Sequence, residues 1–311
     1  MEYTAFYVEE DNNQFSTSLK KISLPSLDEN DIQIHVHYSS LNYKDALASS
    51  GVKGIVKSYP FVPGIDLAGE VINSNQSKQF KNGDLVVATG FGIGMTKNGG
   101  FGEVVNIPEN WILKLPNNLS LLEAMSYGTA GLTAAACVKK ILNSLNSEKP
   151  SIVSGATGGV GSISLQILSK IGIEVHAITG KNNASNILKK MGADEIIDRT
   201  KFLKKIKPLD KSLYSCGIDT VGGDILVKII SLIHQRGSVA CCGNVADNDF
   251  TSSVFPFILR GVSLHGVDSA ESPLELKKEL WDLLSTKWKI DLTNYVKIVT
   301  LNQLNKEIKK I

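Results

Sequence analysis

The sequence predicts an α/β fold in which a doubly wound parallel sheet is joined to a second, strand-rich domain. Strand-like and helix-like patterns alternate from about residue 124 onward, which is typical of a parallel sheet with helices on both faces. A glycine-rich turn lies between a β-branched run and a helical pattern at 151–172. The first 120 residues instead contain short strand-like runs separated by turn-like segments.

The stretch 151–172, "SIVSGATGGVGSISLQILSKIG", carries the strongest local signal. Its first residues form a short β-branched run after Pro150, and apolar residues then recur at near-helical spacing as far as Gly172. The glycines between them lie where a strand becomes a helix, and a helix N-terminus there favours an anion. Gly161 would also let the helix pack close to the strand. The pattern predicts a phosphate-binding turn, and a glycine turn without a ligand is the alternative.

The next segment, "IEVHAITG" at 173–180, is expected to be the second strand of a strand–helix–strand unit of about 30 residues. In an NAD-binding unit an Asp or Glu would end this strand and hold the ribose 2′-hydroxyl. Here the chain reads Thr179, Gly180, Lys181, with no carboxylate and with a cation. We therefore expect an NADP-type 2′-phosphate here, with NADPH as the cofactor. A solvated lysine at a strand end is the alternative.

The patterns place a nucleotide-binding domain at 124–257, inserted into a catalytic domain built from 1–123 and 258–311. In "DIQIHVHYSSL", isoleucines and a valine alternate with polar residues, which predicts a half-buried strand. The glycine-rich stretch "GFGIGMTKNGGFGEVV" is expected to be a loop. Ser120 and Glu123 form a capping-box pattern before a long helix. The segment "DILVKIISLIHQRG" reads as a helix, and "SPLELKKELWDLLSTKWKI" as an amphipathic helix followed by a short strand.

The composition agrees with an ordinary cytoplasmic enzyme, for which we expect a small-molecule substrate. The formal net charge of the 311-residue chain is +2, and 21% of residues are charged, so charge predicts no nucleic-acid or membrane partner. The N-terminus lacks an apolar signal core, and no apolar run is long enough to span a bilayer. The four cysteines form no C-x-x-C pair, which argues against a cysteine-rich zinc site.

Several stretches together resemble one family. They are "SSLNYKDALASSG", "YPFVPGIDLAGEV", "GTAGLTAA", "SGATGGVGS", "GIDTVGG" and "PFILRGVSLHGVDS". In this order they resemble the zinc-free quinone oxidoreductase branch of the medium-chain dehydrogenase/reductases, and most closely its NADPH-dependent acrylyl-CoA reductase group. The resemblance implies a GroES-like catalytic domain, a Rossmann domain and a homodimer. Family members usually continue with a Gly-Arg-containing strand past the position of Ile311, so we expect the catalytic domain to lack that strand.

The resemblance also bears on metal binding. Related alcohol dehydrogenases ligate zinc with a Cys and a His at the positions of Asn42 and Ile65, and neither residue can do so here. His35 and His37 share one strand face and could be considered as ligands, but an exposed face is the simpler explanation. We expect no metal.

Two other catalytic patterns are missing from the sequence: no tyrosine is followed four places on by a lysine, and there is no G-x-S-x-G. Hydride transfer without metal or covalent catalysis remains. This chemistry suits reduction of an activated C=C bond, in which positioning and a few hydrogen-bond donors suffice.

The candidate site residues follow from the resemblance. Asn42 would hold the nicotinamide or the substrate carbonyl, and Tyr43 would orient the cofactor or donate a proton; a plain turn after a strand is the alternative for both. Asp45 and Asp66 are expected to fix the local backbone and side chains. The remaining cofactor contacts would be Thr129, Thr157, Gly158, Gly159, Val160, Thr179, Gly180, Lys181, Arg199, Asn244, Ile258 and Ser269. For Ile258 ordinary core packing is the alternative.

The function expected from these features is NADPH-dependent reduction of the C=C bond of a short enoyl thioester such as acrylyl-CoA. An NADPH:quinone oxidoreductase is the alternative enzyme. A non-catalytic protein that binds NADPH as a sensor is the alternative from a different class.

Overall fold

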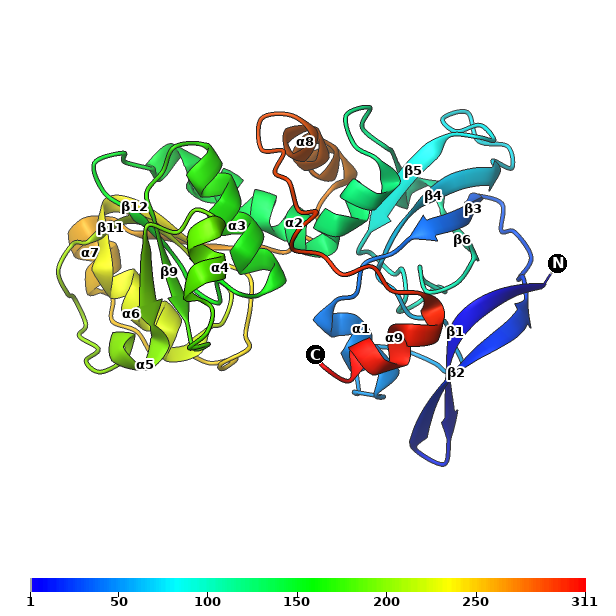
Figure 1. The fold of residues 1–311 in the computed structure, drawn as a ribbon, viewed down its shortest axis with the longest axis horizontal. Helices are drawn as coiled ribbons and strands as arrows, with labels where there is room; N and C mark the ends of the chain where they lie inside the picture. The colour runs from blue at the N-terminus through cyan, green and yellow to red at the C-terminus, as the bar shows by residue number, and fades with distance from the viewer. Residues whose placement is uncertain (1) are drawn as a thin grey trace. The chain divides into compact units, whose positions relative to one another are not determined.

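The computed structural model describes residues 2–311, which group by their contacts into two units (Figure 1). The first, the strand-rich unit, contains the residues up to Thr129 together with 270–285 and 291–311. The second, the parallel-sheet unit, contains 130–269 and 286–290. Both boundaries lie later than the expected 123/124 and 257/258. The later boundary follows from the strand at 263–266, which pairs within the parallel sheet.

Within residues 2–311 the parallel sheet has six strands in doubly wound order, as the sequence predicts. Across the sheet they are β10 (Glu195–Asp198), β9 (Val175–Thr179), β8 (Ser151–Val153), β11 (Tyr214–Asp219), β12 (Ile233–Cys241) and β13 (Ser263–Gly266). The strand order reverses between β8 and β11. The carboxyl ends of these two strands therefore form the switch point where such sheets bind ligands.

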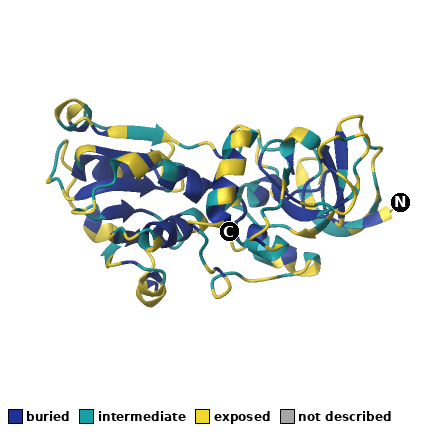
Figure 2. Ribbon diagram, turned by 90° about the horizontal axis from the view of Figure 1, so that it is seen from above, coloured by how far each residue is buried: buried dark blue, intermediate teal, exposed yellow. Residues whose placement is uncertain are grey.

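The helices of this unit are α3 (Gly159–Lys170), α4 (Ser185–Lys190), α5 (Arg199–Phe202), α6 (Gly223–Leu232) and α7 (Phe255–Arg260), with the short 3₁₀ helix η2 (Leu142–Ser144). Since right-handed crossovers run in opposite directions from the switch point, α3 and α6 cover opposite faces of the sheet. The predicted helix at 224–237 ends early: β12 begins at Ile233, because the following residues pair with β11 and β13. The central strands β9, β8 and β11 are mostly buried (dark blue in Figure 2), whereas the edge strands β10 and β13 are partly exposed.

The strand-rich unit contains an antiparallel sheet in the order β6 (Val104–Pro108), β3 (Asp31–Tyr38), β4 (Asp66–Asn73), β5 (Leu85–Thr89), β7 (Leu113–Lys114). The alternation predicted for β3 is confirmed, since Ile32 and Ile34 are buried whereas His35 and His37 are exposed. The 3₁₀ helix η1 (Glu109–Trp111) links β6 to β7. Buried aliphatic residues of these strands form one core cluster.

A hairpin of β1 (Glu2–Asp11) and β2 (Gln14–Ser23) packs beside this sheet. Its two-residue turn, Asn12–Asn13, has positive φ at both positions, as the tight turn of a twisted hairpin requires. Helices α1 (Tyr43–Ser49), α8 (Leu274–Ser285) and α9 (Leu301–Ile308) complete the unit. The short strand expected after α8 was wrong, because residues 286–300 form turns and irregular backbone before α9.

The long helix α2 (Leu121–Ile141) is predicted correctly, with Ser120 and Glu123 forming the capping box. It is interrupted at Gly128, where φ is 50° and ψ is −154°. A Cβ at Gly128 would lie 2.3 Å from the Oγ of Ser40, so both the backbone and the available space require glycine. The interruption makes Thr129 the first residue of a second helical segment.

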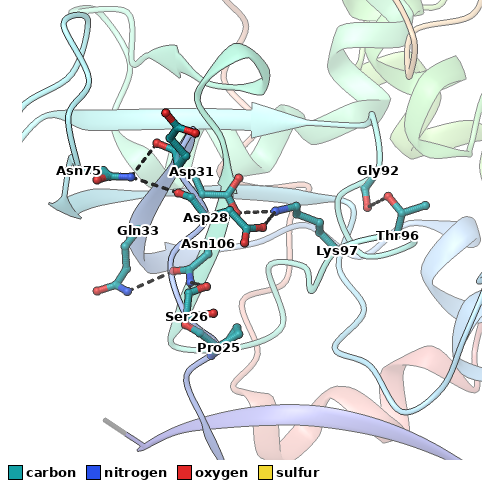
Figure 3. Close-up of polar contacts among 11 residues, drawn as sticks. Pro25, Ser26, Asp28, Asp31, Gln33, Asn75, Gly92, Thr96, Lys97 and Asn106 are labelled. Carbon is teal, nitrogen blue, oxygen red and sulfur yellow. Dashed lines mark hydrogen bonds and ion pairs between the residues drawn. The ribbon is translucent and has the colours of Figure 1, made fainter.

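The glycine-rich segment at 90–102 is a loop, as predicted, and charged groups hold it in place. The ammonium group of Lys97 lies 2.9 Å from the carboxylate of Asp28 and 2.5 Å from that of buried Asp31 (Figure 3). At the start of the loop, the buried Nζ of Lys277 donates to the carbonyls of Thr89 and Ala270, each at 2.7 Å. The same Nζ lies 3.3 Å from the centroid of the Phe91 ring. None of the helices within residues 2–311 has both the length and the apolar character needed to span a bilayer.

Candidate active site

The glycine turn joins β8 to α3 at the switch point of the parallel sheet. Gly155 has φ of 56°, and a Cβ there would lie 2.2 Å from the Oγ1 of Thr220. A Cβ at Gly161 would lie 2.4 Å from the carbonyl oxygen of Gly155, so the predicted close packing of helix against turn is confirmed. Gly158 caps α3 in an extended conformation, and it is exposed together with Gly159. The helix N-terminus is thus open to an anion.

Four of the predicted residues meet at the ends of β9 and β10. Thr179 is paired in register with Asp198, so Arg199 follows directly beside Gly180. The guanidinium group of Arg199 lies against this glycine, because a Cβ at Gly180 would be 3.0 Å from Cζ. The Oγ1 of Thr179 accepts the backbone N–H of Lys181 at 3.1 Å.

The carboxylate of Asp198, which lies beside this group, is engaged in hydrogen bonds with the residues that follow it. Asp198 caps α5, where it accepts the hydroxyl of Thr200 at 2.5 Å and the backbone N–H of Lys201 at 2.9 Å. These hydrogen bonds, that of Thr200 first, lower the pKa of Asp198. The Arg199 guanidinium lies against Gly180 and Lys181 follows it directly, both in exposed residues, so the end of β9 combines two cations and a threonine hydroxyl, groups that suit a phosphate.

The other predicted residues of this unit are more widely spread. Asn244 and Ser269 follow β12 and β13, so they lie at the same carboxyl edge as the glycine turn. Asn244 donates to Asn248 at 2.7 Å, and the hydroxyl of buried Ser269 lies 2.6 Å from that of Thr133. Ile258 is on α7 and is 69% exposed, so core packing was the wrong explanation for it.

The strand-rich unit holds a compact polar cluster around the buried carboxylate of Asp66. Its Oδ2 accepts the side-chain amide of Asn42 at 2.8 Å, the backbone N–H of Thr129 at 2.8 Å and the hydroxyl of Ser40. Its Oδ1 accepts the hydroxyl of Thr129 at 2.5 Å. The amide of Asn42 also reaches the hydroxyl of Ser40 at 3.2 Å.

The start of α1 supports this cluster. Asn42 is the N-cap, and Asp45 completes a capping box by accepting the N–H of Asn42 at 2.8 Å. The other oxygen of Asp45 accepts the N–H of Ile65 at 2.9 Å. The expectation that Asp45 and Asp66 fix local structure is therefore confirmed. Tyr43, the first residue of the helix, is 57% exposed.

Burial governs the ionisation of both acids. It raises the pKa of Asp45 to about 7, against the lowering effect of its backbone hydrogen bonds. Burial also raises the pKa of Asp66, and the hydrogen bonds from Ser40, Thr129 and Asn42 oppose this change. With four donors on its two oxygens, Asp66 has the surroundings of a carboxylate anion.

Ser40 was missed by the sequence reasoning. A carboxylate in the apolar stretch "PGIDLAGEV" requires several hydrogen-bond donors when it is buried. That requirement predicts that hydroxyl groups donate to Asp66, but it does not identify the residues that carry them.

The zinc positions of related enzymes are occupied by non-ligating groups. The amide of Asn42 is bound to Asp66, and Ile65 is a buried apolar side chain. Across residues 2–311, no three His, Cys, Asp or Glu side chains are grouped so that they could hold a metal ion. The rings of His35 and His37 lie 4.9 Å apart on an exposed strand face.

Comparison with protein families agrees with this architecture. Residues 28–117 match the alcohol dehydrogenase GroES-like domain, and residues 159–286 match the zinc-binding dehydrogenase domain. The putative quinone oxidoreductase YhfP of Bacillus subtilis (strain 168) is 41% identical over 93% of this chain and 88% of its own length. The chain belongs to the zinc-free branch of the medium-chain dehydrogenase/reductases.

Other members of this branch are similar over most of their length. The probable acrylyl-CoA reductase AcuI of Escherichia coli (strain K12) is 36% identical over 90% of this chain and 86% of its own. The crystal structure of Bacillus subtilis yhfP with NAD bound has a TM-score of 0.95, covering all of this chain and 95% of that one, at 38% identity. The yhdH oxidoreductase from Salmonella enterica in complex with NADP has a TM-score of 0.94 at 35% identity, covering 98% and 95%.

Membership of this branch confirms the expected domain types and the expected class of enzyme. The chain has a Rossmann-type domain and a GroES-like domain, and it is a medium-chain oxidoreductase.

Proposed function

We propose that this oxidoreductase uses NADPH to reduce the C=C bond of a short enoyl thioester, with acrylyl-CoA as the model substrate. The observation that carries the cofactor proposal is the group of Thr179, Lys181 and Arg199 around Gly180. Two cations and a hydroxyl suit the doubly charged 2′-phosphate that distinguishes NADPH from NADH. The complex of Salmonella enterica yhdH with NADP supports this choice, whereas the NAD-bound yhfP structure makes a direct comparison necessary.

The nucleotide half of the cofactor is assigned to the parallel-sheet unit. Thr157, Gly158, Gly159 and Val160 would hold the pyrophosphate at the open N-terminus of α3. Asn244, Ile258 and Ser269 are assigned to the nicotinamide end. Thr129, in the polar cluster of the strand-rich unit, is assigned as a further cofactor contact.

When bound, NADPH supplies the hydride that adds to the β-carbon of the activated C=C bond. Negative charge then develops on the thioester oxygen, and hydrogen-bond donors lower the energy of that state. The hydroxyl of Tyr43, an exposed residue, is assigned to orient the cofactor or donate a proton. Asn42 has its side-chain amide directed at Asp66, so we assign it to shaping the site around the reacting groups.

The substrate class rests on the similarity to AcuI, since the site residues alone fit several small acceptors. An NADPH:quinone oxidoreductase is the second candidate, because the putative quinone oxidoreductase YhfP is 41% identical. A non-catalytic NADPH sensor is the third. We further propose a homodimer working in the cytoplasm; light scattering on purified protein tests the homodimer.

The deciding experiment measures NADPH oxidation with acrylyl-CoA, crotonyl-CoA and a benzoquinone under matched conditions. We expect the highest kcat/KM with acrylyl-CoA. A higher value for the quinone would favour the second candidate. NADPH binding without turnover of any acceptor would favour the sensor.

A further inference from the structure

We propose that Asp66 is a positioning residue of the reductase, whose carboxylate holds Asn42 and Thr129 in one fixed orientation for hydride transfer. This inference rests on the proposed function, because it assigns a role in the same reaction. Asp66 is completely buried, and the side chains that donate to it come from two other parts of the chain, Ser40 and Asn42 before α1 and Thr129 in α2.

The backbone is shaped around this carboxylate. Gly128 interrupts α2, and a Cβ there would lie 2.8 Å from the Oδ2 of Asp66. Beyond the interruption, the N–H of Thr129 belongs to the first turn of a new helical segment and donates to Oδ2 at 2.8 Å. Asp66 therefore caps this segment from a distant strand, as an acidic N-cap residue does from within the chain.

The carboxylate also sets the direction of each hydrogen bond. An ionised carboxylate only accepts, so the hydroxyls of Ser40 and Thr129 and the amide of Asn42 must all direct protons at it. The oxygens of these two hydroxyl groups are then available only as acceptors toward other groups. The side-chain amide of Asn42 cannot exchange the positions of its nitrogen and oxygen. A neutral side chain of the same shape cannot reproduce this arrangement, because one of its two terminal groups donates.

Asp66→Asn is the sharpest variant, since it keeps the volume and replaces one acceptor by a donor. Misplacement of reacting groups by about 1 Å can lower a rate about 100-fold. We expect kcat to fall about 10- to 100-fold with acrylyl-CoA, while the Kd for NADPH changes less than about threefold. Asp31→Asn is the matched control, because Asp31 is a buried carboxylate of the same unit that pairs with Lys97. It should lose stability and keep kcat.

A second pair of variants tests the proposal even if Asp66→Asn does not fold. Thr129→Val removes only the hydroxyl that donates to Oδ1, and Thr129→Ser retains it. We expect a lower kcat for the valine variant and recovery for the serine variant. In the double variant Asp66→Asn/Thr129→Val, kcat should be only slightly lower than in Asp66→Asn alone. The two effects are not additive, because both substitutions disrupt the same hydrogen-bond network.

The outcomes separate the two proposals. Loss of stability in Asp66→Asn with a wild-type kcat, or wild-type kcat in Thr129→Val, would overturn the positioning role while leaving the proposed function intact. If the wild-type protein turns over a quinone but not acrylyl-CoA, the substrate assignment fails and the same variants are measured with the quinone. If the wild type reduces neither, both proposals fail.

Discussion

The carboxylate of Asp45 in α1 accepts the backbone N–H of Ile65 at 2.9 Å, although 20 residues of sequence separate them. Burial raises the pKa of this acid from 3.8 to about 7. The folded state therefore holds a proton that the unfolded chain releases near pH 4, and the associated stability is present below pH 4 and lost as the pH rises to about 7.

The first prediction concerns this pH dependence. Between pH 4 and 8 the free energy of unfolding should fall by an amount to which Asp45 contributes at most about 4 kcal/mol. Asp45→Asn cannot ionise, so its stability should vary less over this range. Urea unfolding at pH 5 and pH 8 checks this. An equal decrease in both proteins would show that Asp45 is not the titrating group.

The second prediction concerns the buried ammonium group of Lys277. Lys277→Met would remove the charged donor from the carbonyls of Thr89 and Ala270, of which Ala270 still accepts the N–H of Phe91, and a hydrogen bond to a charged group contributes about 1.5–3 kcal/mol. We expect a loss of about 2 kcal/mol or more in the free energy of unfolding. The neighbouring Lys278 is exposed, so Lys278→Met should change stability by less than about 0.5 kcal/mol. Similar losses in both variants would contradict the role of the buried contacts.

The third prediction separates backbone strain from crowding. Gly172 has φ of 81°, and no atom lies within 4 Å of the position that a Cβ would take, so Gly172→Ala should cost only the conformational penalty of about 1 kcal/mol. Gly128→Ala adds contact with Ser40 and Asp66, and its backbone lies outside the left-handed helical region. We expect a loss of more than about 2 kcal/mol. Thermal unfolding of both variants measures the difference, and equal losses would argue against crowding.

The fourth prediction concerns cofactor preference. A charge-assisted hydrogen bond contributes about 1.5–3 kcal/mol, which corresponds to roughly 10- to 200-fold in affinity. Since Lys181 is exposed, Lys181→Ala should weaken NADPH toward the lower end of this range and leave NADH nearly unchanged. Arg199→Ala should act in the same direction. Fluorescence titration with both cofactors measures this, with Lys189→Ala as an exposed-lysine control. Equal losses for NADPH and NADH would place the 2′-phosphate elsewhere.

The fifth prediction is that activity needs no metal. Asn42 and Ile65 occupy the positions of the zinc ligands in related alcohol dehydrogenases. The side chain of Asn42 donates a hydrogen bond to Asp66, and that of Ile65 is buried in the core. Dialysis against EDTA should leave kcat and the melting temperature unchanged. Stoichiometric zinc by elemental analysis, together with activity lost on chelation, would overturn this prediction.

Much of the parallel-sheet unit could be predicted because its signals are local. The β-branched run, the glycines and the helical periodicity at 151–172 lie in one continuous segment, and each produces the element that it predicts. The end of α6 was misplaced, because strand pairing at Ile233 overrides an apolar pattern that suits either a helix or a buried strand.

The polar cluster around Asp66 was less predictable. Asn42 and Asp66 stood out in the sequence, yet their contact depends on the tertiary arrangement that brings β4, the start of α1 and Thr129 together. Gly128 appeared in a helical pattern and as the first residue of the stretch "GTAGLTAA", and neither predicts the break in α2. The position of Arg199 beside Gly180 likewise depends on the register of β9 and β10.

The order of the two units along the chain determines when each of them is fully synthesised. The strand-rich unit is synthesised in separate stretches, because 140 residues of the other unit, 130–269, lie between Thr129 and Ala270, and 286–290 belong to that unit as well. At about 5–20 residues per second, a ribosome needs on the order of ten seconds to deliver this insertion. Throughout that interval the carbonyl of Thr89 lacks the ammonium group of Lys277, which is translated after every strand of the parallel sheet. The strand-rich unit can therefore complete its contacts only after the last strand of the parallel sheet has been synthesised, whereas the parallel-sheet unit can begin to fold before that point.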